Sequence, residues 1–205
     1  RYCASYSFDG IYSVSTNWGG KMLLEKYLIA HCAPTLASLK TASLFCMSVL
    51  PEDDLDGQIQ NWNGRLWEKG LFLMILKRYR GKALVYVCRK SHLQMDLKKA
   101  GVANFLAQYG YQHTDLKYAL TRLRQRLNEN HSFPHEIGIF LGYPLEDVVG
   151  FIENAGKNCK CTGYWKVYSN ECETIKLFAQ FQKCRKIYIR LWNQGKSVQQ
   201  LTVAV

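Results

Sequence analysis

Proline is scarce in this chain, and long apolar runs are missing. Only 4 prolines occur among 205 residues, and they are not gathered into a linker that would divide the chain. Apolar runs such as residues 71–76 are the length of a strand, whereas a membrane-spanning helix needs roughly 18 apolar residues in a row. We therefore expect one folded domain and no membrane partner.

Signature motifs of common enzyme classes are also missing. The chain has no glycine-rich dinucleotide loop, no phosphate loop and no CxxC pair. His135 and Glu136 begin like a zinc-protease motif, but Ile139 stands where the second histidine ligand would be. Residues 1–20 lack the apolar core of a signal peptide, so we expect a loosely ordered start followed by one domain over residues 21–205.

Cysteine, by contrast, is abundant, with 8 residues in the chain. In a secreted protein an even count could form disulfide bonds. This chain shows no secretion signal, and its hydrophobic content of 48% is enough to form a core that needs no disulfide bonds. The composition therefore predicts reduced thiols in the cytoplasm, several of them buried as small apolar residues.

The net charge of +11 is distributed unevenly. Residues 65–128 hold 14 basic and 3 acidic side chains, so this middle third carries the whole excess. Such a surface attracts an anionic partner at long range but gives no specificity. A solvated surface explains it equally well, and since no nucleic-acid-binding motif occurs, we do not expect a nucleic acid partner.

Both helical and strand patterns occur along the chain. Residues 71–78 and 83–89 are β-rich and flank a short polar gap with Gly81, which is typical of a hairpin. Further strands are predicted at 43–50, 135–141, 164–168 and 187–192, and helices at 21–32, 55–69, 91–110, 114–127, 144–156 and 170–184. Two alternatives stay open: a helix at 43–50, and a break near Gly101 in the helix at 91–110. This order predicts an α/β or α+β fold: a mixed sheet with one β-hairpin, covered by helices.

Distinctive short segments occur along nearly the whole chain. They are Leu24–Leu28, His31–Ala37, Phe133–Gly138, Phe140–Pro144, Gly156–Cys161 and Gly163–Tyr168. Together they resemble the domain of unknown function family 3793, over about residues 22–205. The resemblance implies a free-standing bacterial, cytoplasmic protein of the clostridia and their relatives. It implies no reaction.

Cys32 is the most suggestive thiol, because Pro34 follows it closely. If Pro34 opens a helix, Cys32 lies at the N-terminus of that helix, where backbone N–H groups lower a thiol pKa. A nucleophilic thiol also needs a base, and His135 is the natural candidate, oriented by Glu136 or Asn158. The alternative interpretation is a buried cysteine beside a helix-capping histidine.

Cys159 and Cys161 lie one residue apart in a basic loop and could bind a soft metal together with a histidine. A four-thiol zinc site would also need Cys172 and Cys184, which one continuous helix would hold about 18 Å apart. We therefore exclude the four-thiol site unless that helix breaks. The alternative interpretation is a turn with incidental thiols.

A strand-to-helix junction at residues 142–144 is the kind of place where ligands bind in α/β proteins, and exposed helix amides there could receive an anion. Gly142 could equally serve the turn alone. We expect the ligand-binding residues to be His31, Lys40, Gly142, Tyr143 and Asn158.

Two functions stay open from the sequence. The first is a thiol-dependent hydrolase or transferase with Cys32 as nucleophile, His135 as base and Glu136 as its partner. The alternative is a non-catalytic binding or accessory protein for a metal or an anionic partner. Under either function, the expected partner is a small molecule or an anionic partner of unknown identity. The sequence names no cofactor.

Overall fold

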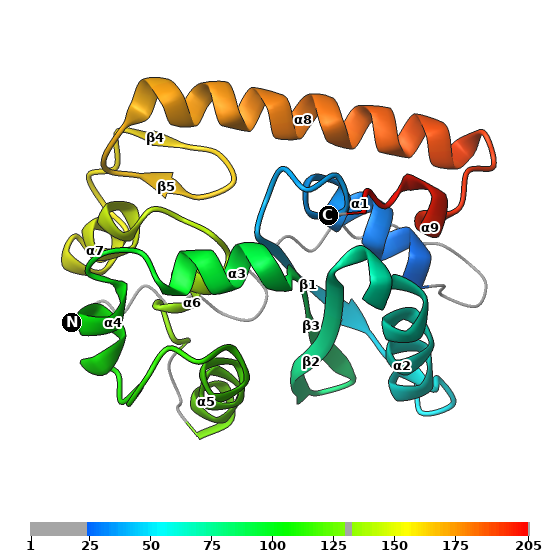
Figure 1. The fold of residues 1–205 in the computed structure, drawn as a ribbon, viewed down its shortest axis with the longest axis horizontal. Helices are drawn as coiled ribbons and strands as arrows, with labels where there is room; N and C mark the ends of the chain where they lie inside the picture. Colours follow the sequence, from blue (N-terminus) through cyan, green and yellow to red (C-terminus); the bar gives the residue numbers. More distant parts are fainter. Residues whose placement is uncertain (1–23, 130–132, 205) are drawn as a thin grey trace.

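The computed structural model describes residues 24–129 and 133–204. The expectation of a loosely ordered start at residues 1–20 lies outside this range. The helices are α1 (Leu24–Leu36), α2 (Leu55–Leu66), α3 (Lys90–Leu97), α4 (Val102–Ala107), α5 (Leu116–Glu129), α6 (Ile137–Phe140), α7 (Leu145–Glu153), α8 (Glu171–Asn193) and α9 (Val198–Leu201), with a 3-10 turn η2 (Trp67–Lys69) (Figure 1). The strands are β1 (Ala42–Ser48), β2 (Leu71–Tyr79), β3 (Lys82–Arg89), β4 (Cys161–Thr162) and β5 (Lys166–Val167). Across the described ranges, no helix has the length and apolar character to span a membrane.

The main sheet has three antiparallel strands in the order β1-β3-β2. β2 and β3 form the predicted hairpin, and Arg80 and Gly81 are its two loop residues. Their φ angles are 46° and 71°. Positive φ at both central positions is the geometry of a type I′ turn, whose twist matches that of the strands. The hairpin prediction is confirmed.

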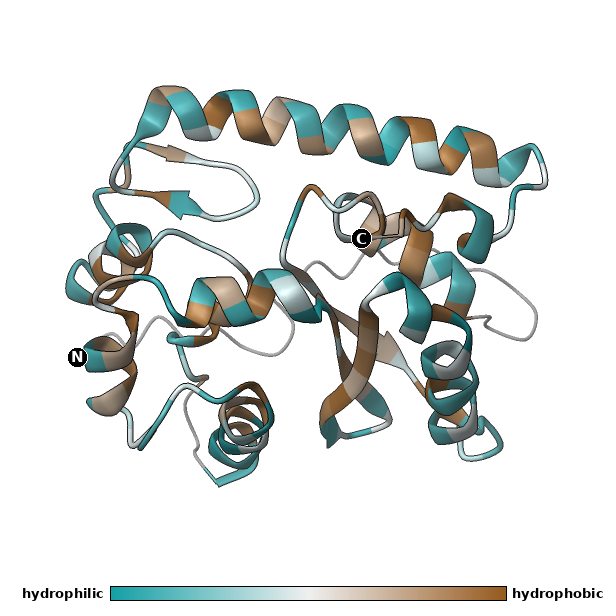
Figure 2. Ribbon diagram, viewed as in Figure 1, coloured by the Kyte–Doolittle hydropathy of each residue, from teal (hydrophilic) through white to brown (hydrophobic). Residues whose placement is uncertain are grey.

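The sheet separates two hydrophobic cores, because the central strand β3 is buried on both faces. Leu84, Tyr86 and Cys88 face the core formed with α3 to α7, and the alternate residues Val85 and Val87 face the core formed with α1, α2 and α9. Figure 2 shows the apolar residues gathered on the strands and on the inner faces of these helices. The predicted mixed α/β fold with helix-covered sheet is confirmed.

A buried arginine joins the sheet to α1. Arg89 is 0% exposed, and its guanidinium donates to the carbonyl oxygens of Thr35 at 2.8 Å, Leu36 at 2.5 Å and Lys69 at 2.8 Å. The last carbonyl groups of a helix have no partner within it. Arg89 therefore satisfies the C-terminal end of α1 and fixes it beside β3.

The prediction of a strand at residues 135–141 is wrong. The segment forms the short helix α6, in which the amide of Leu141 donates to the carbonyl of Ile137 at 3.0 Å. Every residue of α6 is buried. A short run that is apolar on all sides does not distinguish a helix from a strand by periodicity, so the sequence pattern could not settle this element.

The C-terminal prediction is also wrong, because α8 is one helix of 23 residues. The sequence predicted a helix ending near Cys184 and a strand over 187–192. Isoleucine, tyrosine and tryptophan favour strands, but propensity is a weak signal that packing overrides. Tyr188, Ile189 and Trp192 pack against the core formed with α1, and this packing continues the helix to Asn193 along one edge of the molecule (Figure 1).

Candidate functional site

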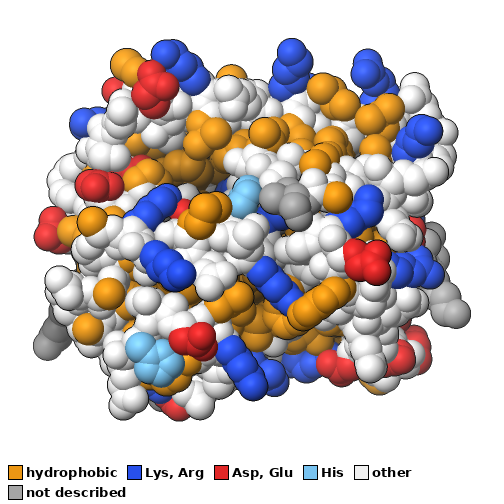
Figure 3. Space-filling model, in the orientation of Figure 1, with side chains coloured by type: hydrophobic (Ala, Val, Ile, Leu, Met, Phe, Trp, Pro, Cys, Tyr) orange, Lys and Arg blue, Asp and Glu red, His pale blue; other side chains and the backbone are white. Residues whose placement is uncertain are grey.

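A pocket of about 750 Å³ lies between the two halves of the molecule. One side is built by α1 and the start of β1, and the other by α6, α7 and the β4–β5 hairpin. α8 borders it through Gln182 and Arg185. Figure 3 shows apolar side chains gathered below α8, with lysine and arginine side chains along the edge over that helix. The site therefore joins segments from residue 30 to residue 185.

Aromatic rings form the wall beside the β4–β5 hairpin. Tyr143 and Trp165 stack with their centroids 4.6 Å apart, and Trp165 meets Phe178 of α8 edge-on at 4.6 Å. The hydroxyl of Tyr143 donates to the carbonyl of Tyr164 at 3.3 Å. These contacts hold the rings in fixed orientations, so the wall presents flat apolar surface.

Asp147 is the one carboxylate among the described lining residues, and its acceptor sites are occupied. It is 2% exposed. Its oxygens accept from the Trp165 indole N–H, from the Tyr168 and Ser169 amides and from the Ser169 hydroxyl, each at 2.8 Å. Asp147 therefore anchors the β4–β5 hairpin to α7, and its oxygens already hold four hydrogen bonds that a ligand would have to displace.

Lys40 contributes a buried amine to the pocket. Its Nζ donates to the carbonyl of Leu141 at 2.9 Å and to the carbonyl of Ala42, and it lies 5.1 Å from the Tyr143 ring centroid. Burial lowers the pKa of this amine to about 7, although Cys32 and Asp96 favour its charged form. Lys40 is thus half protonated near neutral pH.

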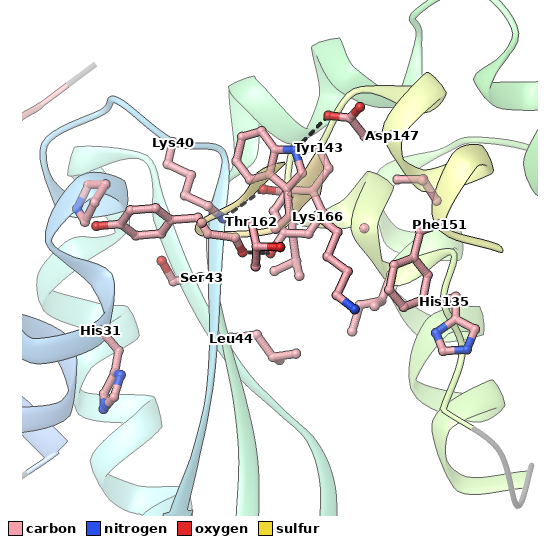
Figure 4. Close-up of a pocket in the computed structure, with 18 of the residues that line it drawn as sticks. His31, Lys40, Ser43, Leu44, His135, Tyr143, Asp147, Phe151, Thr162 and Lys166 are labelled. Carbon is pink, nitrogen blue, oxygen red and sulfur yellow. Dashed lines mark hydrogen bonds between the residues drawn. The ribbon is translucent and has the colours of Figure 1, made fainter. Parts of the chain in front are cut away.

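Two histidines face the pocket from opposite sides, His31 from α1 and His135 from the segment before α6 (Figure 4). Burial, with a smaller contribution from the nearby Arg185 guanidinium, lowers the pKa of His31 to about 4. Burial also lowers the pKa of His135, and Glu136 opposes this shift. The His31 imidazole is therefore neutral at pH 7.

Two further basic side chains, Lys166 and Arg185, line the pocket. Lys166 of β5 extends toward Phe151 and His135 (Figure 4), and its Nζ donates to the Gly156 carbonyl at 2.6 Å. Arg185 is exposed on α8, and no salt bridge involves it within residues 24–129 and 133–204. The pocket therefore carries positive charge at neutral pH.

The helix placement behind the thiol hypothesis is wrong. Pro34 lies inside α1 and does not open a new helix, so Cys32 is a mid-helix residue, 0% exposed. Its thiol hydrogen-bonds Ser43, and burial raises its pKa to about 12. α1 lies across the pocket from His135 (Figure 4), and Cys32 is not among the residues that line it. These features match the alternative interpretation of a buried cysteine.

Glu136 is buried beside α5, on the side of the sheet that α3 to α7 cover. It is 0% exposed and forms a salt bridge with Arg126 of α5, and the Tyr111 hydroxyl donates to the same oxygen, Oε1, at 3.4 Å. It is not a lining residue. The pairing of its carboxylate with α5 does not support its predicted role as the partner of His135.

Gly142 and Asn158 also lie outside the pocket lining. Gly142 has a φ of 78°, and a Cβ atom there would come within 2.6 Å of the Thr41 hydroxyl oxygen, so glycine serves the turn. Asn158 is exposed, and its side chain donates to Asn154 at 3.4 Å. Of the five predicted ligand-binding residues, His31, Lys40 and Tyr143 line the pocket.

The two loop thiols differ in their surroundings, because Cys161 packs against the hydrophobic cluster around Trp165 and Phe178. Cys159 contacts the Thr162 hydroxyl at 3.4 Å, and both cysteines are partly exposed. Within the described ranges no group of three His, Cys, Asp or Glu side chains could hold a metal ion. α8 is unbroken between Cys172 and Cys184, which is the condition on which the exclusion of a four-thiol site depended.

Sequence reasoning missed Arg185, Lys166 and Trp165 as pocket residues. The sequence did not place Arg185 near the site, because the helix predicted at residues 170–184 ended one residue before it. Lys166 and Trp165 stood in a predicted strand, where nothing in the sequence shows which way a side chain faces. The clustering of aromatic and basic residues at 164–166 was the available signal.

Comparison with known proteins gives one result. The family model described as "Protein of unknown function (DUF3793)" matches residues 28–202. No curated protein and no solved structure matches the chain. The family match covers both sides of the pocket and α8, and it agrees with the resemblance seen in the sequence. The chain belongs to the DUF3793 family of proteins of unknown function.

Proposed function

We propose that the protein binds a small organic anion that carries an aromatic ring, in the pocket below α8. The observation that carries this proposal is the combination of lysine and arginine side chains with one carboxylate that is already fully hydrogen-bonded. This is the binding-protein alternative that the sequence left open, now assigned to defined residues.

The dimensions of the pocket support a small molecule. Ligand sites in proteins occupy about 300–1,000 Å³ and are mostly apolar with a few polar groups, and this pocket has about 750 Å³. A molecule with one or two rings and an acidic group would occupy such a space. A folded protein domain would not enter it.

The basic side chains of the pocket favour a negatively charged ligand. Arg185 is planar and permanently charged, and it can pair with a carboxylate or phosphate through two parallel hydrogen bonds. Lys166 adds a second basic side chain, on the side of the pocket where His135 and Phe151 lie (Figure 4). A cationic ligand would meet only Asp147, whose oxygens are occupied.

The aromatic rings of the pocket wall favour a ligand with a planar ring. Tyr143 and Trp165 are stacked and held by hydrogen bonds, so they lose little freedom when a ring packs on them. Preorganised aromatic surface of this kind favours planar ligands over flexible aliphatic ones.

Thermal unfolding in the presence of aromatic and aliphatic acids tests the proposal. We expect naphthalene-1-carboxylate and phenyl phosphate to raise the midpoint of unfolding, because a ligand at 100 times its Kd stabilises the folded state by about 2.7 kcal/mol. Acetate at the same concentration and ionic strength is the control. An equal midpoint with aromatic acids and with acetate, up to millimolar concentration, would overturn the proposal.

A further inference from the structure

We propose that Lys40 is a nucleophile that forms an imine with an aldehyde or ketone group of the ligand bound in this pocket. The inference rests on the proposed function, because it needs a ligand in the same site. It assigns to the site a covalent step and narrows the ligand to an aromatic anion that bears a carbonyl carbon.

The position of the amine is the first argument. Lys40 is a lining residue, and its Nζ lies 5.1 Å from the centroid of the Tyr143 ring. Its backbone follows the turn after α1, where the Lys40 amide donates to the Pro34 carbonyl at 3.2 Å. The backbone is thus anchored and the stem is enclosed, so the nitrogen is held at one point of the wall. A carbonyl carbon bound against Tyr143 would lie next to it.

The hydrogen bonds of the amine are the second argument. A neutral amine has two N–H bonds and one lone pair, whereas an ammonium group has three N–H bonds. Within the described part of the chain, Nζ donates to two acceptors, the carbonyls of Ala42 and Leu141. Two acceptors match the two N–H bonds of the neutral form, so its lone pair takes no part in these hydrogen bonds, and the ring of Tyr143, a lining residue, lies 5.1 Å from the nitrogen.

The charge state agrees with this geometry. Burial lowers the pKa of Lys40 to about 7, so a large fraction of the amine is neutral and nucleophilic at physiological pH. Cys32 and Asp96 oppose this shift by favouring the ammonium form, and Asp96 is the carboxylate of the two. Asp96 is itself engaged by the Thr41 hydroxyl at 2.5 Å and by Lys99 at 2.6 Å.

The step is a simple condensation. The Lys40 lone pair attacks the carbonyl carbon, so a C–N bond forms and the carbonyl π electrons move to oxygen. Loss of that oxygen as water, with the two hydrogens that Nζ carried, leaves the C=N double bond. No oxidant or reductant takes part, and the imine, once it takes up one proton from solvent, carries one N–H that can donate to the Leu141 or the Ala42 carbonyl.

In the alternative, purely structural role, the hydrogen bonds of Lys40 would hold the turn after α1 against the turn after α6, 101 residues away in the sequence. These hydrogen bonds hold whether or not the nitrogen can react. Reactivity toward a carbonyl probe therefore separates the two roles, and it is measured on the wild-type chain, so the test does not depend on whether a Lys40 variant folds.

The probe is pyridoxal 5′-phosphate, an aromatic aldehyde with an anionic group, followed by borohydride reduction and peptide mass spectrometry. We expect Lys40 to be modified at least 10-fold faster than the exposed Lys98 at pH 7.5, and naphthalene-1-carboxylate to slow this modification. Modification of Lys40 no faster than Lys98 would overturn the imine. In parallel, Lys40→Met should abolish the fast phase.

The non-carbonyl analogue pyridoxamine 5′-phosphate separates the two proposals. If it binds, as measured by quenching of tryptophan fluorescence, while Lys40 is not trapped, then the imine is wrong and the anion pocket stands. If neither binding nor trapping occurs at millimolar concentration, both proposals fail for this ligand class. Binding together with selective trapping supports both.

Discussion

Two buried cations in this protein are paired with backbone carbonyl groups rather than with carboxylates. Arg89 donates to three carbonyls at the end of α1 and at η2, and Lys40 donates to two. Arginine stays charged when buried, so Arg89 acts as a permanent structural donor. Lysine can release its proton, so the same kind of environment leaves Lys40 able to change its charge.

Titration of Lys40 should make stability depend on pH. Its pKa is about 7 in the folded chain against an ordinary value of 10.5, so between these values the unfolded chain binds more protons and the free energy of unfolding rises with pH. We expect wild type to gain up to about 1.4 kcal/mol per pH unit between pH 7 and 9 relative to Lys40→Met.

Urea unfolding at pH 7, 8 and 9 measures this difference, with Lys98→Met as the control for removal of an exposed lysine. The window stops at pH 9 because the buried thiols Cys32 and Cys88, whose pKa values are about 12, oppose the trend above it. Parallel pH profiles for wild type and Lys40→Met would contradict the lowered pKa.

The cysteines should differ widely in reactivity. Cys32 and Cys88 are 0% exposed, and burial raises the pKa of each thiol to about 12, whereas Cys172 is exposed on α8. The thiolate is the reactive form. We expect iodoacetamide at pH 7.5 to modify Cys172 first and Cys32 only after unfolding.

Mass spectrometry of the modified peptides over time follows each site. Rapid, selective labelling of Cys32 in the folded chain would contradict the buried position described here. It would also restore the thiol nucleophile that the sequence suggested.

At the scale of elements, local signals located most of the fold but not its longest helix. The turn at Gly81 was visible in the sequence because glycine is favoured where φ is positive. Gly101, with a φ of 80°, separates α3 from α4 within residues 91–110, which the sequence assigned to a helix. The continuity of α8 depends on packing against α1, which joins residues more than 150 positions apart. No local pattern contains that information.

The contact between α8 and the β4–β5 hairpin depends on a glycine. A Cβ atom at Gly163 would lie 2.2 Å from the Phe178 ring, while a Cβ atom at Gly64 in α2 would meet nothing within 4 Å. We expect Gly163→Ala to destabilise the protein by about 1–3 kcal/mol through overpacking. The matched Gly64→Ala should stabilise it by about 0.5–1 kcal/mol, because alanine is the better helix former.

Thermal or denaturant unfolding of the two variants measures these opposite changes in the free energy of unfolding. If Gly163→Ala were as stable as wild type, the close approach of α8 to the hairpin would be wrong. A ligand that binds at the pocket should also bind Gly163→Ala more weakly, since Gly163 and Trp165 line the same wall.

At the scale of the molecule, the pocket forms because the fold brings together segments that lie far apart in the sequence. The lining residues come from both sides of the sheet and from α8, so the sequence could propose His31, Lys40, His135 and Tyr143 one by one but could not show that they share a pocket. The charge pattern was similarly incomplete. The basic excess of residues 65–128 lies outside the pocket lining, whereas two cations that define the site, Lys166 and Arg185, come from the nearly balanced C-terminal third.

The central claim is that this pocket recognises negative charge on a ring. Calorimetric titration with naphthalene-1-carboxylate and its neutral isostere naphthalene-1-carboxamide tests it most directly, in wild type, in Arg185→Gln and in Lys186→Gln, which removes the neighbouring cation outside the pocket lining. We predict at least 10-fold tighter binding of the carboxylate to wild type and to Lys186→Gln, and loss of most of that preference in Arg185→Gln. Equal affinity of wild type for the acid and the amide, or an equal effect of the two variants, would contradict the account.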